Sequence, residues 1–265
     1  MPKLLTVLKT GLRRSYFFVH QLYFTLAGNA VSCNICKFKA NKLNSDSWHL
    51  YTICPRCQSG VRQRLLWEAL CSLEEVNLRN LITDKKVLHF APEHILRDLI
   101  RKTASLYKTA DFFAGDYTYP NIDYNLDISA MPKITDSSYD CLIACDVLEH
   151  VQDHHSAFME INRVLKPGGY CILTVPQKDG LQVTLEDLSI TDPAEREKAF
   201  GQSDHLRIYG ADFAKMLDHS GFDVFTVNEQ SFPAETVRRF VLFPPVLSEQ
   251  PMATNHRTIY FGKKR

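Results

Sequence analysis

Residues 139–175, YDCLIACDVLEHVQDHHSAFMEINRVLKPGGYCILTV, decide the fold. The segment opens with the apolar run YDCLIAC, has helical spacing of apolar residues over 156–165, turns at KPGG and closes with the apolar run YCILTV. Short apolar strands that alternate with amphipathic helices are typical of parallel sheets. The segment therefore predicts one β-α-β unit.

The same alternation extends over the chain after residue 82. We predict strands at 86–90, 106–111, 139–145, 170–175, 222–227 and 258–261, and helices at 94–102, 156–165 and 211–220. The pattern predicts an α/β fold with a doubly wound, mostly parallel sheet and helices on both faces. Ligands of such sheets bind beyond the carboxyl ends of the strands, so site residues are expected directly after them.

Composition sets the broad class of protein. The chain has 265 residues, of which 45% are hydrophobic and 23% charged, with a net charge of +1. These values predict a folded cytoplasmic protein. They argue against a nucleic-acid partner, because the chain lacks the large positive charge that binds phosphates. No apolar run reaches the roughly 18 residues of a membrane span. Residues 1–82 hold 11 Lys and Arg against 4 Asp and Glu, which indicates a basic front region.

Four of the eight cysteines form two pairs, Cys33-x-x-Cys36 and Cys54-x-x-Cys57. Two such knuckles complete a tetrahedral four-sulfur site, for which zinc is the usual ion and iron the alternative. All four positions would be filled by protein, so the metal would be structural. The other four cysteines are interpreted as buried, unreactive thiols: Cys71, Cys141, Cys145 and Cys171.

Two basic residues and an aromatic-rich stretch flank this ribbon. Arg62 and Arg64 follow the second knuckle, and we interpret them as solvated side chains, with an anion contact as the alternative. Residues 4–27 mix apolar and basic side chains. They could pack on the main domain, form an oligomer contact or touch a membrane surface, and we favour packing.

Acidic residues follow the predicted strands. Asp111 ends the second strand, where a carboxylate can bind a ribose diol. Asp127 follows a short apolar step and could receive an adenine amino group, and Asp146, Glu149 and His150 follow the strand at 139–145. Each residue alone could be a helix cap or a surface polar group. Their joint position after successive strands favours a site.

A second candidate cluster lies in the insert at 177–209 and the adjoining FGQSDHLRIYG, residues 200–210. Such a long connection over the carboxyl edge predicts a lid or a substrate platform. His205 is a candidate general base, Arg207 a clamp for an anionic substrate, and Gln202 and Tyr209 further substrate contacts. The alternative is a loop whose polar groups, Asp204 included, bond only to one another.

Residues 127–176 resemble class I S-adenosylmethionine-dependent methyltransferases. The resemblance rests on Asp140 at the start of a strand, on LEHV, and on RVLKPGG before the next strand, and it covers roughly residues 83–265. It implies a seven-stranded sheet with a reversed final hairpin and an enzyme that uses S-adenosylmethionine. Together with the cysteine pairs and the helical spacing before residue 82, it divides the chain into four regions: an N-terminal helical segment 1–30, a zinc ribbon 31–60, a connecting helix 61–82 and a methyltransferase domain 83–265.

The resemblance also assigns the cofactor residues. Asp111 would hold the ribose, Asp127 and Ile128 would flank the adenine, and Asp146 would lie at the methionine end.

The loop after the first strand departs from the family pattern. The family has a glycine-rich turn there, whereas this chain has His89, Phe90, Ala91, Pro92 and Glu93. Glycine allows positive φ and close approach, so the loop must reach the cofactor by another path. It resembles the loop of methyltransferases with an N-terminal ribbon of paired cysteines. Glu93 would bind the methionine ammonium or cap the next helix.

The predicted reaction is methyl transfer to a small, anionic acceptor. Sugar-modifying methyltransferases with zinc-binding N-terminal regions resemble this layout, so a nucleotide-linked sugar or another glycan precursor is the first expectation. Orientation alone can supply much of the rate. His205 and His150 are the candidates if the acceptor must lose a proton. The alternatives are an RNA or protein methyltransferase that uses the ribbon as a reader, and a non-catalytic binding module.

Overall fold

The computed structural model describes residues 28–113 and 122–265. The expected helical segment at 1–30 lies almost wholly outside the described residues, as does the stretch 4–27 with its three alternative roles. Within the described residues, no helix is long and apolar enough to cross a membrane.

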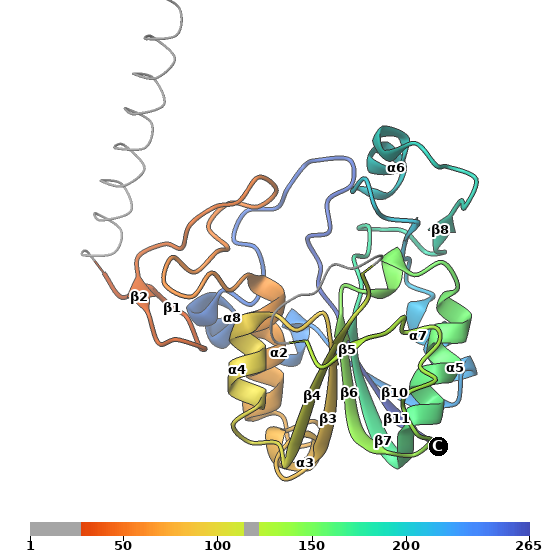
Figure 1. Ribbon diagram of the computed structural model, residues 1–265. Helices are drawn as coiled ribbons and strands as arrows, with labels where there is room; N and C mark the ends of the chain where they lie inside the picture. The colour runs from red at the N-terminus through yellow and green to blue at the C-terminus, as the bar shows by residue number, and fades with distance from the viewer. Residues whose placement is uncertain (1–27, 114–121) are drawn as a thin grey trace, which may run out of the picture.

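Seven strands form the central sheet in the order β10-β11-β7-β6-β3-β4-β5 (Figure 1). Their bounds are β3 Lys86–Phe90, β4 Leu106–Asp111, β5 Tyr124–Asn125, β6 Tyr139–Cys145, β7 Leu165–Thr174, β10 Phe222–Val227 and β11 Ile259–Lys264. Only β11 is reversed, and it pairs antiparallel with both β7 and β10. The predicted α/β sheet with its reversed hairpin is confirmed.

Helices cover both faces of the sheet (Figure 1). One face carries α2 Val61–Ser72, α3 Leu78–Leu81, α4 His94–Ile100 and α8 Ala234–Phe240, and the other carries α5 His154–Val164 and α7 Phe213–His219. Because the central strands are covered on both faces, their side chains are apolar on both. Val87 faces the core under α2 and α4, whereas its neighbour Leu88 faces the core under α5 and α7.

Smaller elements lie above the carboxyl edge of the sheet (Figure 1). The ribbon contains the pair β1 Val31–Ser32 and β2 Lys39–Ala40, and the insert contains β8 Leu185–Glu186, α6 Pro193–Phe200 and β9 Arg207–Ile208. The 3-10 turn η1 Leu148–His150 directly follows β6, and η2 Glu229–Ser231 follows β10. The ribbon and the insert thus approach the same edge from opposite sides.

Burial of the four unpaired cysteines differs from the expectation at one position. Cys141, Cys145 and Cys171 are buried in the sheet, as predicted, but Cys71 is exposed near the end of α2. Residues at the end of a helix alternate between the core and the solvent within one turn, so the apolar neighbours of Cys71 did not fix its side.

Asp140 fastens three strands at the amino edge of the sheet. Its Oδ2 accepts a hydrogen bond from the backbone N–H of Lys86 at 2.9 Å, and its Oδ1 accepts one from Lys166 Nζ at 2.7 Å. The expected turn at KPGG is wrong, because these residues lie within β7, whose pairing with β6 has a register shift there. Gly169 passes closely by the neighbouring backbone, since a Cβ on it would lie 2.9 Å from the Lys166 carbonyl oxygen and 3.0 Å from that of Asp140. These contacts explain why an acid and a glycine pair stand at these positions.

We predict that Asp140→Asn lowers the free energy of unfolding by about 1–2 kcal/mol at pH 7. Burial works against the charge, but Lys166 and the Lys86 amide hold the pKa of Asp140 below its usual value. The stabilisation is therefore complete above the unfolded pKa and is lost as pH falls through the folded one. Urea denaturation at pH 7 and pH 3 checks this, with Asp98→Asn on the exposed side of α4 as the control. An equal loss at both pH values would contradict the prediction.

Candidate functional site

The four paired cysteines lie on two knuckles of the same backbone geometry. The backbone N–H of Lys37 donates to the Cys33 carbonyl at 2.9 Å, and that of Gln58 donates to the Cys54 carbonyl at 2.8 Å. Lys37 and Gln58 both have left-handed backbones, with φ of 62° and 61°. Each knuckle therefore turns its two cysteines toward the same point.

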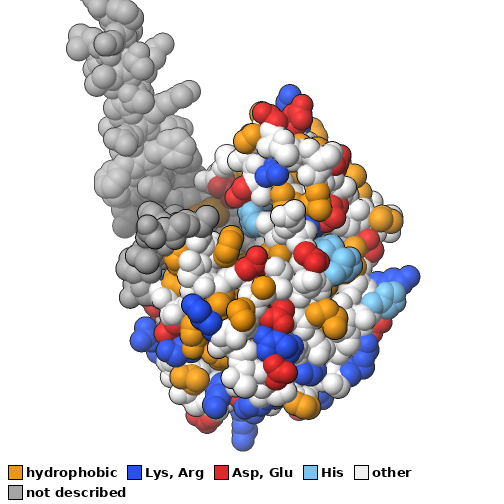
Figure 2. Space-filling view, turned by 45° about the vertical axis from the view of Figure 1, so that its right-hand side comes forward, with side chains coloured by type: hydrophobic (Ala, Val, Ile, Leu, Met, Phe, Trp, Pro, Cys, Tyr) orange, Lys and Arg blue, Asp and Glu red, His pale blue; other side chains and the backbone are white. Residues whose placement is uncertain are grey.

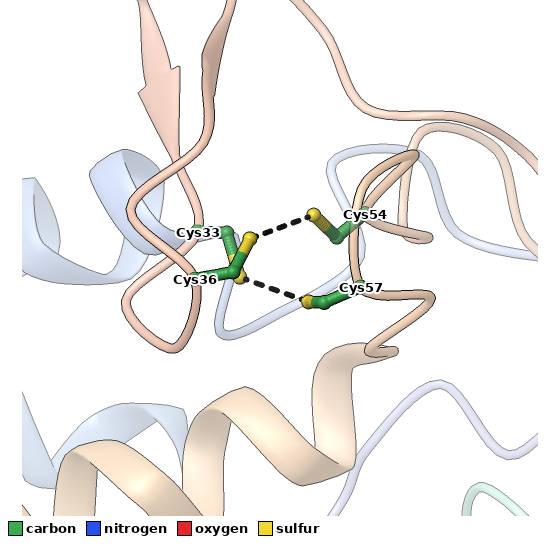
Figure 3. A group of neighbouring side chains, drawn as sticks. All are labelled: Cys33, Cys36, Cys54 and Cys57. Atoms are coloured by element: carbon green, nitrogen blue, oxygen red, sulfur yellow. Dashed lines mark hydrogen bonds between the residues drawn. The ribbon is translucent and has the colours of Figure 1, made fainter. Parts of the chain in front are cut away.

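The four sulfur atoms gather at that point (Figure 3). Cys33 and Cys57 are 3.6 Å apart at Sγ, as are Cys36 and Cys54, and all four sulfurs lie within 4.8 Å of one another. Sulfurs bound to one zinc at about 2.3 Å in tetrahedral geometry are roughly 3.8 Å apart. The cluster fits a four-sulfur metal centre of a zinc-ribbon-like region.

Arg64 anchors this ribbon to the rest of the chain. It is completely buried, and its guanidinium donates to the carbonyl oxygens of Thr52 at 2.7 Å, Phe240 at 2.9 Å and Val241 at 2.9 Å. The interpretation of Arg64 as a solvated side chain is wrong, because the side chain is buried. Nothing in the sequence indicated this, since the carbonyls that it binds come from the ribbon and from the far end of the chain.

Arg62 lies over the carboxyl edge of the sheet and is also not solvated, since its side chain is only 12% exposed. Its guanidinium binds the carboxylate of Glu93, and its Nε lies 3.0 Å from Asp146 Oδ2. Burial opposes the charge on Arg62, but Asp146 and Glu93 together hold its pKa above the usual value. The basic residue that follows the ribbon thus joins the two acids that the resemblance places at the methionine end.

Glu93 does not cap the helix that it precedes. It stands at the N-cap position of α4 without a capping hydrogen bond, and its Oε1 accepts one from Gln63 Nε2 at 2.7 Å. The Glu93 carboxylate is therefore bound by Arg62 and Gln63 of α2, and not by the backbone of α4.

Two non-glycine residues at the carboxyl edge have left-handed backbones, and one of them, Ala91, belongs to the glycine-free loop. Ala91, directly after β3, has φ of 43°, and its N–H donates to the Ala110 carbonyl at 2.9 Å. Asp146, directly after β6, has φ of 52°, and its N–H donates to the Thr174 carbonyl at 2.9 Å. Non-glycine residues rarely adopt this conformation, and such strain concentrates at functional sites. Ala91 thus takes the turn for which the family pattern has glycine, with Pro92 next in the loop.

His89 lies beneath this loop. It is completely buried in β3, and its Nδ1 is 2.8 Å from the Tyr107 hydroxyl. Burial, with Arg62 and Arg97 nearby, lowers the pKa of His89 to about 3, so it is neutral at pH 7. The His89 side chain thus contacts Tyr107 of the neighbouring strand and lines neither of the cavities described below, which does not fit the expectation that it binds the cofactor.

The expected adenosine residues stand after β4 and β5. Asp111 is half-buried, its Oδ1 accepts from the Phe112 N–H at 2.8 Å, and burial raises its pKa. Asp127 Oδ1 accepts from the Ser129 N–H at 2.8 Å, and Ile128 is buried beside it. Phe112 was not among the residues predicted from the sequence. It follows Asp111 directly, and its side chain is 63% exposed. An aromatic residue after a strand-ending acid was the available signal.

A cavity of about 340 Å³ opens beside Asp146. Its walls come from the ribbon, from η1, from the insert and from the segment before β11. The polar residues that line it include His49, Asp146, Glu149, His150, His205 and Arg257. A second cavity of about 170 Å³ contains Arg62 and Gln63 and shares His49, Asp146 and Arg257 with the first. The two cavities therefore meet at Asp146.

Glu149, His150 and His205 gather on one wall of the larger cavity. The His150 and His205 rings meet edge to face with centroids 4.8 Å apart, and His150 Nε2 lies 3.9 Å from Glu149 Oε1. Burial raises the pKa of Glu149 and lowers that of His205. The two predicted catalytic histidines thus lie together, and Glu149, named in the sequence only as one of the acids after β6, joins them.

Two of the expected substrate contacts lie away from the cavity. Arg207 is completely buried, binds Glu186, and donates to the Leu148 carbonyl at 2.8 Å. The Tyr209 hydroxyl lies 2.8 Å from His154 Nδ1 and is also buried. The expectation that Arg207 and Tyr209 touch a substrate does not fit these positions, since both fasten the insert to the main domain. Gln202 does line the cavity.

Comparison with known proteins agrees with this geometry. A family model described as a methyltransferase domain matches residues 87–173. A probable S-adenosylmethionine-dependent methyltransferase of Mycolicibacterium smegmatis is 24% identical over 131 residues, which are 49% of this chain and 47% of that protein. An uncharacterized 37.1 kDa protein of a Streptomyces fradiae transposon is 32% identical over 109 residues, which are 41% of this chain and 31% of that protein. The match thus spans less than half the length of either relative.

Among solved structures, an S-adenosylmethionine-dependent methyltransferase of Mesorhizobium loti aligns with a TM-score of 0.49 at 14% identity, over 77% of this chain and all of that one. The matched family model and the strand order of the sheet, with its single reversed strand, both indicate a methyltransferase domain. The chain contains a class I S-adenosylmethionine-dependent methyltransferase domain, preceded by a four-cysteine ribbon.

We predict that Cys57→Ser removes most of the zinc bound per chain and lowers the thermal unfolding midpoint by several degrees. A structural metal contributes its binding free energy to folding, and serine is a poor replacement for a thiolate ligand. Elemental analysis and calorimetric unfolding of the purified protein check this. Cys71→Ser, at an exposed cysteine outside the cluster, is the matched control and should retain both properties. Equal zinc content in the two variants would contradict the assignment.

Proposed function

We propose that the chain transfers a methyl group from S-adenosylmethionine to a small, anionic acceptor bound in the 340 Å³ cavity. The observation that carries this proposal is the meeting of the two cavities at Asp146. The smaller one is lined by Arg62 and Asp146 of the expected methionine end, and the larger one has the size of a small-ligand pocket. A donor methyl group held near Asp146 would face directly into the acceptor cavity.

The proposed cofactor site runs along the carboxyl ends of four parallel strands. Asp111 binds the ribose diol, and Phe112 stacks on the adenine, which Asp127 and Ile128 flank from the next loop. These residues end or follow β4 and β5, so the strand order already brings them side by side. The adenosine half of the site thus depends on the sheet alone.

The methionine half depends on α2 as well as on the sheet. The carboxylate of the cofactor carries a negative charge and its ammonium a positive one. Arg62 offers the guanidinium that a carboxylate prefers, and Glu93 with Asp146 offers acceptors for the ammonium. The ion pairs of Arg62 keep these groups oriented in the absence of ligand. The loop 89–93, with His89, Ala91 and Pro92, supplies the backbone beneath them.

The acceptor cavity suits a polar molecule that places its negative charge against Arg257 and His49, because Asp46, Asp146 and Glu149 line other parts of it. Arg257 and His49 line it together with His150, and Trp48 adds an aromatic surface. On the face in Figure 2, the described Lys and Arg side chains are interspersed with acidic and apolar ones rather than gathered into one stripe. A small anion such as a nucleotide-linked sugar fits this distribution better than a nucleic acid does.

In the proposed reaction, the acceptor oxygen attacks the methyl carbon in line with the sulfonium. The new O–CH3 bond forms as the S–CH3 bond breaks, its electron pair remains on sulfur, and S-adenosylhomocysteine leaves. The hydroxyl proton passes toward the wall formed by Glu149, His150 and His205. Positioning by the ribbon and the insert supplies much of the rate, because both exclude water from the cavity.

Two cofactor fragments separate the two halves of the site. We predict that Arg62→Lys weakens binding of S-adenosylhomocysteine about tenfold and leaves binding of 5′-methylthioadenosine, which lacks the amino-acid end, almost unchanged. Asp111→Ala should weaken both ligands about tenfold or more, because both contain the ribose. Isothermal calorimetry measures the affinities of both variants and of the wild type for the two ligands. Asp223→Asn, at an exposed residue of β10, is the control.

Equal weakening of both ligands by Arg62→Lys would contradict the role of Arg62 at the methionine end. No binding of S-adenosylhomocysteine to the folded wild-type chain at millimolar concentration would overturn the proposed activity.

A further inference from the structure

We propose that Glu149, His150 and His205 bind a divalent transition-metal ion on the wall of the acceptor cavity, separate from the four-cysteine centre. One ligand atom from each of the three residues lies within 4.8 Å of the other two. Two imidazoles and one carboxylate form a ligand set that first-row divalent ions accept, with the remaining coordination positions left open.

Two atoms of this group are buried without a partner. Glu149 is 1% exposed and His205 is 2% exposed, yet neither Glu149 Oε2 nor His205 Nε2 has a hydrogen-bond partner among the described residues. A buried polar atom without a partner costs roughly 1–3 kcal/mol. An ion between the two atoms would satisfy both, and each of these residues lines the cavity.

The remaining nitrogens orient the two rings. His205 Nδ1 lies 3.1 Å from the Phe200 carbonyl oxygen, which only accepts, so Nδ1 carries the proton and Nε2 has the free lone pair. His150 Nδ1 lies 3.4 Å from Asp204 Oδ2, while its Nε2 is directed toward Glu149. Histidines that bind metals in proteins have this arrangement, in which an outer oxygen fixes one nitrogen and the other faces the ion.

The backbone around the three residues is fixed by the insert. The Leu206 N–H donates to the Glu149 carbonyl at 2.9 Å. Arg207 donates to the carbonyls of Leu148 at 2.8 Å and Gln152 at 3.0 Å. These contacts tie η1 to the insert, so ligands about 55 residues apart in sequence stay together. The site is built before any ion arrives.

An ion at this position would face the acceptor directly, and this consequence rests on the proposed function. Open coordination positions would take the acceptor hydroxyl, and a bound divalent ion lowers the pKa of an oxygen ligand. The proton would then leave along this same wall, which reaches solvent at His150, while the oxygen attacks the methyl group. The two histidines would act as metal ligands, so no free imidazole base is needed.

Metal binding can be measured without turnover. The probes are Zn²⁺ and Mn²⁺, titrated by calorimetry into full-length protein that already holds one zinc per chain in the four-cysteine centre. We predict one further binding event per chain, with micromolar or tighter affinity for at least one of the two ions. Manganese has little affinity for thiolates, so its binding reports the nitrogen and oxygen site.

The double variant Glu149→Gln, His205→Asn should weaken this second event at least about tenfold. It should still hold one zinc and unfold cooperatively, which shows that it is folded. His219→Asn, at an exposed histidine of α7, is the control and should bind as wild type does.

Absence of a second event with both ions, or equal binding by the folded double variant, would overturn the proposed metal site. S-adenosylhomocysteine binding, measured on the same samples, tests the proposed activity independently. Its failure would leave the result on the metal unaffected.

Discussion

The proposed cofactor edge of this protein depends on one half-buried ionic contact, in which Arg62 lies between Glu93 and Asp146. Glu93 follows the first strand of the sheet and Asp146 the strand beside it, so the two acids would repel each other without a cation between them. The side chain of Arg62 is only 12% exposed, and those of Glu93 and Asp146 are 24% and 28% exposed, so removing Arg62 would leave two partly desolvated carboxylates unpaired. Arg62 therefore allows Glu93 of the glycine-free loop to lie near Asp146, because its positive charge offsets the repulsion between the two carboxylates.

The same contact explains why a ribbon precedes the sheet. Arg62 stands in the first turn of α2, five residues after Cys57, and Arg64 fixes that turn to the ribbon and to α8. A metal centre that orders the second knuckle would thereby also position the guanidinium at the proposed methionine end. The ribbon contributes His49 and Trp48 to the acceptor cavity. The basic residues of the ribbon itself, Lys37, Lys39, Lys42 and Arg56, are exposed, whereas Arg62 and Arg64 of α2 lie largely inside the molecule.

Sequence patterns predicted the sheet because its central strands, β3 and β6, are buried on both faces and therefore largely apolar. The bounds of four strands agree with the expectation, and the acids after them follow from the rule that ligands bind at that edge. Contacts between distant segments leave no such pattern. Arg62 and Arg207 resemble surface residues in sequence, and only the folded chain shows that each lies among oxygens from other elements. Phe112 was not among the predicted residues, and Glu149 was predicted only as one of several polar residues that follow a strand.

Hydrogen exchange with and without S-adenosylhomocysteine tests most directly whether α2 is part of the cofactor site. The account predicts that the ligand slows exchange of the backbone amides at residues 61–66 together with those at 91–97 and 111–113. Slower exchange after the strands alone, with α2 unchanged, would contradict the central role of Arg62. The ribbon would then be a wall of the acceptor cavity without a part in holding the cofactor.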